Sequence, residues 1–132
     1  MSQSVQRTRE QQRASQAWSD IQEVKEQLQE PAQKEYGSLA RRVPTLVITN
    51  GLGQTLAYLK AKAKNEQSDH YGLMYRHLSR WTMGTVSPQG GDLLRWVQGE
   101  ADSVTYRWAT VEALAYLGWL KRFAEAELPR PE

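Results

Sequence analysis

Few residues of this chain have the type and spacing that chemistry requires, because it contains no cysteine and only two histidines. His70, Met74 and His77 fall on one face of a predicted helix, which is a spacing that metal ligands also use. That face offers no carboxylate or third strong ligand, so we expect solvated histidines and predict no metal site. We also predict no cofactor.

Glu112 is the most informative carboxylate, since helical spacing places it among aromatic residues such as Trp108, Tyr116 and Trp119. Burial would raise its pKa unless a cation or hydrogen-bond donor compensates. We expect a structural pair with an arginine or an indole N–H. The alternative is a small hydrolase that uses Glu112 as an acid beside a neighbouring histidine. No second catalytic group is apparent, so we predict no catalytic residues and no enzyme.

Two glycine-rich stretches suggest phosphate binding at first sight, namely Gly51-Leu52-Gly53 and residues 84–91. Neither stretch follows a predicted strand, and neither matches the GxxxxGK[ST] or GxGxxG motif. At Gly51 and Gly53 we expect instead that the missing side chains allow another helix to approach closely.

Basic charge is concentrated in the middle of the sequence. The chain carries 17 Lys and Arg against 15 Asp and Glu, but residues 36–80 carry seven against two. Lys60 and Lys64 share one helical face, and so do Arg76 and Arg80, so two adjacent helices could form a groove suited to phosphates. The alternative is ordinary solvated surface. The candidate RNA-binding residues are Arg41, Arg42, Lys60, Lys64, Arg76 and Arg80.

These residues must be positioned by helices, because no stretch alternates as a strand would. Apolar residues recur at helical steps from Ala14 to Leu28, which predicts a long N-terminal helix that ends at Pro31. The pattern then predicts a short helix at Tyr36–Arg42 and one helix from Pro44 to about Lys64 across Asn50-Gly51. A helix of about 14 residues, capped by Ser68 or Asp69, is expected next, followed by a loop over residues 84–91 that contains Pro88. A short helix capped by Asp92 and a last helix from Val104 to about Glu127, capped by Asp102 or Ser103, complete the predicted elements.

The last predicted helix is the most apolar segment and is expected to be central. The predicted fold is therefore all-α, a compact bundle of about five to six helices in a single domain that spans residues 1–132. No apolar run is long enough for a membrane span, and the absence of cysteine favours the cytoplasm. Five tryptophans exceed what a small core easily encloses, so we expect exposed apolar surface that docks a partner or another copy of the chain.

Two segments resemble the small helical subunit of the type III-B CRISPR effector, the Cmr complex. They are RVPTLVITNGLGQTLAYLKAK at residues 42–62 and YLGWLKRFAEA at residues 116–126. The resemblance extends over essentially the whole chain, although each motif alone is weak.

The resemblance implies a noncatalytic subunit that stacks with copies of itself beside the other Cmr subunits and helps to seat guide RNA and target RNA in antiviral defence. Cleavage in that family belongs to other subunits, and the family offers no short motif from which RNA-contacting residues can be transferred. The alternative interpretation is a helical protein–protein adaptor without direct RNA contact.

Overall fold

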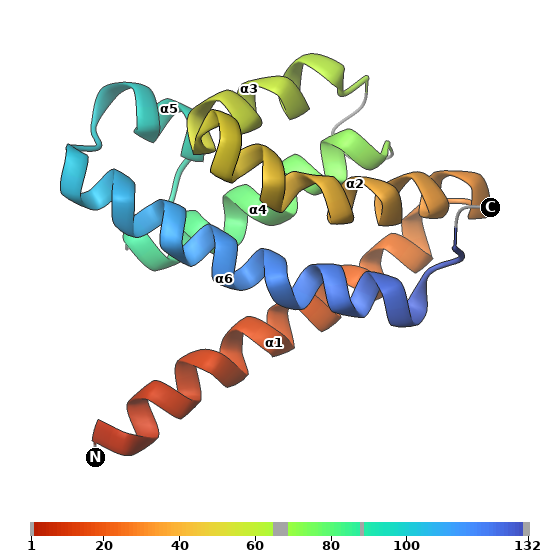
Figure 1. Cartoon of the computed structure of the whole chain (residues 1–132), viewed down its shortest axis with the longest axis horizontal. Coiled ribbons are helices and arrows are strands. Elements are labelled where there is room, and N and C mark those ends of the chain that lie inside the picture. The colour runs from red at the N-terminus through yellow and green to blue at the C-terminus, as the bar shows by residue number, and fades with distance from the viewer. Residues whose placement is uncertain (1, 65–68, 88, 131–132) are drawn as a thin grey trace.

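Six α-helices make up the described part of the chain, in which there is no β-strand (Figure 1). The computed structural model describes residues 2–64, 69–87 and 89–130, and for residues 2–7 it describes the backbone only. The helices are α1 (Ser2–Gln27), α2 (Glu30–Asn50), α3 (Leu52–Lys62), α4 (His70–Val86), α5 (Leu93–Gly99) and α6 (Ser103–Glu127). The predicted all-α class is confirmed.

Helix α6 lies at the centre of the bundle and packs against α1, α2 and α4. Its small and large apolar residues are both buried, so neighbouring helices approach it closely on several sides. The buried positions include Ala109, Ala113, Tyr116, Leu117 and Leu120. This arrangement agrees with the expectation that the most apolar segment is the central helix.

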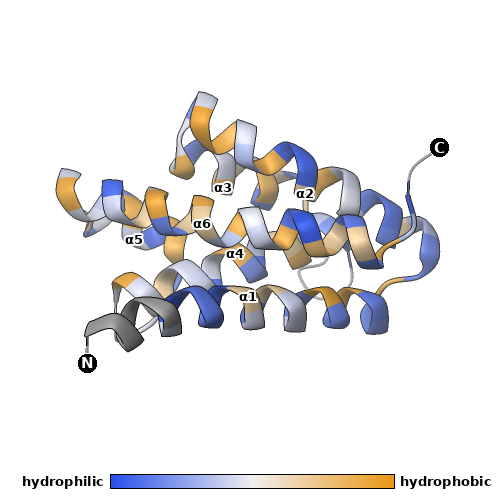
Figure 2. Cartoon of the chain, turned by 60° about the horizontal axis from the view of Figure 1, so that its bottom comes forward, coloured by the Kyte–Doolittle hydropathy of each residue, from blue (hydrophilic) through white to orange (hydrophobic). Residues whose placement is uncertain are grey.

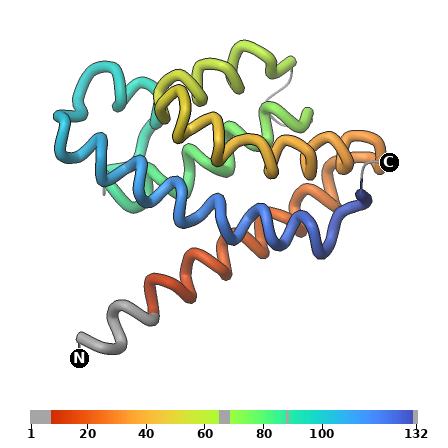
Figure 3. Tube along the Cα trace, in the orientation of Figure 1, coloured from red at the N-terminus to blue at the C-terminus, as the bar shows by residue number. Residues whose placement is uncertain are grey.

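Helix α1 crosses α6 at an angle, as the Cα trace shows (Figure 3). It is mostly hydrophilic, with hydrophobic residues recurring along it (Figure 2). Its buried hydrophobic residues are Ala17, Ile21 and Val24, and Leu28 is buried just beyond its end. All four belong to the stripe seen in the sequence. A helix with so narrow an apolar stripe gains little from burial alone, so polar contacts are needed to hold it.

The structure corrects the helix start predicted at Pro44. Helix α2 already begins at Glu30 and continues through Pro44, which lies inside it. Tyr36, Ala40, Val43 and Val47 are buried at steps of four, three and four residues across the proline. Burial of this stripe outweighs the cost of about 3 kcal/mol for proline in a helix interior.

The structure also corrects the single helix predicted across Asn50-Gly51. Gly51 ends α2 and has φ 92° and ψ 158°, a backbone conformation that is essentially reserved for glycine. Ile48 is 72% exposed and does not continue the buried stripe of α3, which consists of Leu52, Leu56 and Leu59 together with Thr55.

Close approach at Gly53 is confirmed. Its backbone N–H donates to the Tyr106 hydroxyl at 3.1 Å, and a Cβ atom there would lie 3.2 Å from Val97 Cγ1. The chain reversal at Gly51 thus allows α3 to pack against α5, with Gly53 in contact with Tyr106 near the start of α6.

Aspartates cap the later helices. Asp69 accepts from the Gly72 N–H, Asp92 accepts from the Arg95 N–H, and Asp102 forms a capping box with Thr105.

Helix α4 is longer than predicted and includes Gly84, which was expected to lie in a loop. Ser68 and Pro88 lie outside the described residues. Among the described helices, none combines the length and hydropathy needed to cross a membrane.

Candidate nucleic-acid interface

Arg76 and Arg80, two of the predicted RNA-binding residues, turn toward acidic residues of α1. Arg76 Nη2 lies 2.6 Å from Glu23 Oε2, and Arg80 Nη2 lies 2.7 Å from Asp20 Oδ1. The Asp20 side chain is 1% exposed, while that of Arg80 is 49% exposed. The two guanidinium groups are therefore largely neutralised and offer a phosphate less attraction than the sequence suggests.

His77 lies at the centre of this cluster and is fully buried, so the expectation of a solvated side chain is wrong for it. Its Nδ1 lies 2.7 Å from the Tyr36 hydroxyl, and its Nε2 lies 2.7 Å from Glu23 Oε1. Burial lowers the pKa of His77 below its ordinary value, although Asp20 and Glu23 oppose this shift. A neutral ring that donates from Nε2 to Glu23 and accepts from Tyr36 at Nδ1 satisfies both contacts.

Asp20, Glu23 and His77 place three possible metal-ligand atoms within 4.8 Å of one another. The guanidinium groups of Arg76 and Arg80 already lie against the same carboxylate groups and balance their charge. A cation would have to displace an arginine to enter. Because the Tyr116 hydroxyl of α6 also donates to Asp20, the cluster joins four helices and acts as a structural anchor for α1.

Glu112 confirms the expectation of a buried structural pair. Its carboxylate receives hydrogen bonds from Arg13 Nη2 at 2.5 Å and Arg13 Nε at 3.1 Å, and Trp81 Nε1 lies 3.4 Å away. Burial raises the pKa of Glu112, but Arg13, Arg9 and Trp81 together outweigh it and leave the pKa below its ordinary value. Glu112 is thus held ionised, which suits an ion pair and not a proton donor.

The surroundings of three further candidates, Lys60, Arg42 and Lys64, differ from those of Arg76 and Arg80. The ammonium group of Lys60 lies 5.6 Å from the centre of the Tyr75 ring, whose hydroxyl donates to Asp92. Arg42 is hydrogen-bonded to Tyr58, which raises the pKa of the arginine. The Lys64 side chain is exposed just after α3. Unlike Arg76 and Arg80, these three cations form no ion pair with an acidic residue in the described part of the chain.

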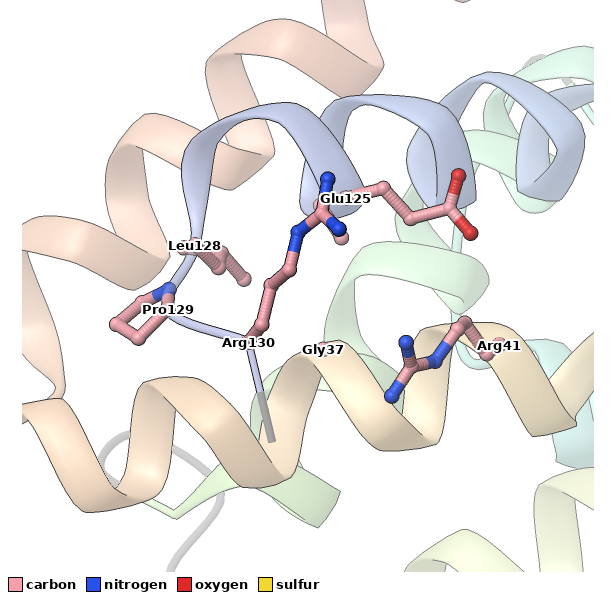
Figure 4. Close-up of a pocket in the computed structure, with 7 residues that line it drawn as sticks. Gly37, Arg41, Glu125, Leu128, Pro129 and Arg130 are labelled. Atoms are coloured by element: carbon pink, nitrogen blue, oxygen red, sulfur yellow. The ribbon is translucent and has the colours of Figure 1, made fainter. Parts of the chain in front are cut away.

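Arg41 lines a cavity of about 280 Å³ between α2 and the C-terminal end of the chain. Figure 4 shows Arg130 on the opposite wall and Glu125 of α6 beside it. Neither Arg130 nor Glu125 was predicted as a site residue, because more than 80 residues separate them from Arg41. Only the packing of α6 and the chain end against α2 brings them together.

A strip of exposed apolar residues follows the solvent side of α6. Val104 is 70% exposed, Trp108 is 41% exposed and Val111 is 58% exposed. Ala115 and Gly118 continue the same face at steps of four and three residues. We call these five residues the outer α6 face. Trp18 of α1, 43% exposed, is the other tryptophan that is largely open to solvent among the described residues.

The comparisons with known proteins agree with the fold and with the resemblance. A family described as CRISPR-associated protein (Cas_Cmr5) matches residues 9–127. A curated relative from Thermotoga maritima, named CRISPR system Cmr subunit Cmr5, is 31% identical over 104 residues, which cover 78% of this chain and 74% of the relative.

A solved structure gives the same result. It is the X-ray crystal structure of a CRISPR-associated Cmr5 family protein from Thermus thermophilus, with a TM-score of 0.67 and 25% identity. The match covers 92% of this chain and 98% of that protein. This chain is therefore a small all-α CRISPR-associated protein. It belongs to the Cmr5 family.

Proposed function

We propose that this chain is a noncatalytic subunit of a type III-B CRISPR effector, the Cmr complex, and that it helps to seat guide RNA and target RNA in the cytoplasm. The observation that carries the proposal is the family match over residues 9–127, which extends from within α1 to the last residue of α6. In this complex the chain contacts other Cmr subunits and further copies of itself.

The noncatalytic part of the proposal is supported by the state of the titratable groups in the core. Glu112 is held ionised by Arg13, and His77 is enclosed between Tyr36 and Glu23. Both side chains have their hydrogen-bonding atoms engaged within the bundle. The hydrolase alternative required Glu112 beside a histidine, but the groups that contact its carboxylate are arginines and an indole.

The RNA part of the proposal is supported by cations that are open to solvent. Lys60, Lys64 and Arg41 are exposed, and no described acidic residue forms an ion pair with them. Paired RNA strands are recognised largely through shape, phosphates and 2′-hydroxyls, which requires a basic surface and no deep base-reading pocket.

A second candidate function, a protein–protein adaptor without RNA contact, is favoured by two observations. Arg76 and Arg80 direct much of their charge toward Glu23 and Asp20. The outer α6 face, in contrast, is apolar and open, as a docking surface for another Cmr subunit would be.

Charge reversal in the reconstituted complex separates the two functions. The variant Lys60→Glu/Lys64→Glu is expected to lower guide and target RNA retention as salt rises, because phosphate contacts release counterions. The matched control is Arg95→Glu/Arg107→Glu, which reverses two exposed arginines outside the basic middle of the sequence that form no ion pair with a described residue. Equal retention for both variants, with assembly and thermal stability unchanged, would favour the adaptor and contradict RNA contact by Lys60 and Lys64.

A further inference from the structure

The cavity between α2 and the C-terminal end combines two cations, one carboxylate and an apolar wall (Figure 4). We propose that it binds one ribonucleotide unit of an RNA strand, with a phosphate held by Arg41 and Arg130 and the ribose 2′-hydroxyl donating to Glu125. This inference rests on the proposed function, since it assumes that the chain meets RNA, and it assigns that contact to a particular site.

The charge state of the two arginines supports a phosphate ligand. Arg13, Arg76 and Arg80 each lie within 2.7 Å of a carboxylate oxygen. Arg41 and Arg130, in contrast, form no ion pair within 4.0 Å with any described residue. Their guanidinium groups come from two walls of one cavity. Such planar groups bind phosphate oxygens through paired hydrogen bonds.

Glu125 gives the cavity a feature that a simple phosphate site lacks. A carboxylate repels a phosphate but accepts a hydrogen bond from a hydroxyl group. Glu125 Oε1 lies 3.4 Å from Arg122, and that arginine is 74% exposed, so the pair is weak and leaves the second carboxylate oxygen available. The 2′-hydroxyl distinguishes RNA from DNA, so this arrangement favours a ribose over a deoxyribose.

The size and the remaining wall of the cavity agree with a single nucleotide unit. A volume of about 280 Å³ lies at the lower limit of small-molecule sites and is too small for a dinucleotide cofactor. Ala124, Leu128 and Pro129 form an apolar wall against which a sugar or base can pack.

The phosphate contact is tested by measuring the anisotropy of fluorescent oligouridine with the full-length chain and by RNA retention in the reconstituted complex. The variant Arg41→Ala/Arg130→Ala is expected to bind RNA roughly tenfold more weakly. Its dependence on salt should also decrease, by a slope of about 0.7 for each phosphate that the variant no longer neutralises. The matched control is Arg95→Ala/Arg107→Ala, which removes two exposed arginines outside the cavity and should change affinity much less.

The hydroxyl contact is tested with Glu125→Ala and with oligodeoxyuridine, which differs from oligouridine only in the missing 2′-hydroxyl. If Glu125 accepts from the ribose, the variant loses affinity for RNA, and its RNA-to-DNA affinity ratio falls several-fold toward one. If Glu125 only repels the phosphates, the variant instead binds both oligouridine and oligodeoxyuridine more tightly, which would overturn the assignment of Glu125.

The remaining outcomes separate this inference from the proposed function. If the wild type binds or retains RNA but both arginine pairs have equal effects, the cavity assignment is wrong and the proposed function stands. If the cavity variants impair assembly and leave RNA affinity unchanged, the arginines bind an acidic protein segment, which also overturns the inference. If the wild-type chain does not bind RNA, and the reconstituted complex retains RNA equally well with and without this chain, the RNA function and the cavity assignment both fail.

Discussion

Individual ion pairs hold α1 to the rest of the bundle. Asp20 is matched by Arg80 of α4, and Arg13 of α1 is matched by Glu112 of α6. In each pair the carboxylate is at least 96% buried, while its arginine retains some exposure. Because α1 has only a narrow apolar stripe, these pairs specify which residues of α1 meet α4 and α6.

Removal of the Arg13 side chain should therefore destabilise the fold. Arg13→Ala leaves the buried Glu112 with Trp81 and the more distant Arg9, whose Nη1 lies 3.6 Å from Glu112 Oε2. We expect a loss of about 2–3 kcal/mol, below the value for a completely unpaired buried charge. Urea unfolding followed by circular dichroism measures this change.

A double variant provides the control for this pair. Arg13→Met/Glu112→Leu removes both charges and retains side chains of suitable size, so its stability should return to within about 1 kcal/mol of the wild type. If Arg13→Ala alone has no effect on the unfolding free energy, then the ion pair contributes nothing to the attachment of α1.

His77 should make the stability of the fold depend on pH. Burial lowers its pKa below the ordinary 6.5, so the unfolded chain takes up a proton more readily than the folded chain. The free energy of unfolding should therefore decrease as pH falls through and below about 6.5. Glu23 and Glu112, whose pKa values lie below the ordinary 4.5, should add a further loss in more acidic solution.

Thermal unfolding between pH 8 and pH 5 measures the contribution of His77, those limits being about 1.5 units on either side of its ordinary pKa. His77→Gln should be less stable at pH 8 by about 2 kcal/mol, because Tyr36 and Glu23 lose a buried partner, but should depend less on pH. His70→Gln is the comparison variant, since burial also lowers the pKa of His70 but its side chain is partly exposed, so this variant should reduce the pH dependence less than His77→Gln does. An unchanged pH dependence in His77→Gln would show that the ring is not neutral in the fold.

At the scale of the elements, the sequence predicted the helices better than their boundaries. The stripe of α1, the aspartate caps and the central position of α6 follow from the spacing of residues that are close together in the sequence. Because proline favours the first turn of a helix, the sequence predicts a new helix at Pro44, whereas the buried stripe of α2 continues across it. At Gly51 the apparent continuation from Ile48 to Leu52 concealed a chain reversal that only tertiary packing explains.

Substitution of Gly51 should test that chain reversal. Gly51→Ala forces a side chain onto a backbone with φ 92° and should cost about 1–3 kcal/mol. The control is Gly84→Ala inside α4, where a Cβ atom meets nothing within 4 Å. Because alanine is the better helix former, the control should stabilise the chain by about 0.5–1 kcal/mol. Unfolding midpoints that shift in the same direction for both variants would contradict the break at Gly51.

At the scale of the whole molecule, counting charges did not reveal which cations remain available. Residues 36–80 contain seven Lys and Arg. The fold turns Arg76 and Arg80 toward acids of α1, but it leaves Arg41 at a cavity with the distant Arg130. Neither outcome can be derived from the sequence, because each depends on residues brought together by packing between helices. Glu112 was predictable because its aromatic neighbours lie on its own helix.

The outer α6 face should be required for assembly and not for folding. Val111→Glu places a charge on a side chain that is 58% exposed, so the isolated chain should lose less than about 0.5 kcal/mol of stability. In the reconstituted Cmr complex, however, the charge would be buried against a partner subunit without compensation, which should lower incorporation at least tenfold. Co-purification with tagged Cmr subunits measures incorporation.

Ile48→Glu is the matched control for this docking surface, because Ile48 is an equally apolar residue of α2 with 72% exposure that lies outside the outer α6 face. We expect it to assemble as the wild type does. Trp108→Ala should resemble Val111→Glu, since aromatic residues dominate the binding energy of protein interfaces. Normal incorporation of both α6 variants would show that this face remains open in the complex, and impaired incorporation of Ile48→Glu alone would assign docking to α2.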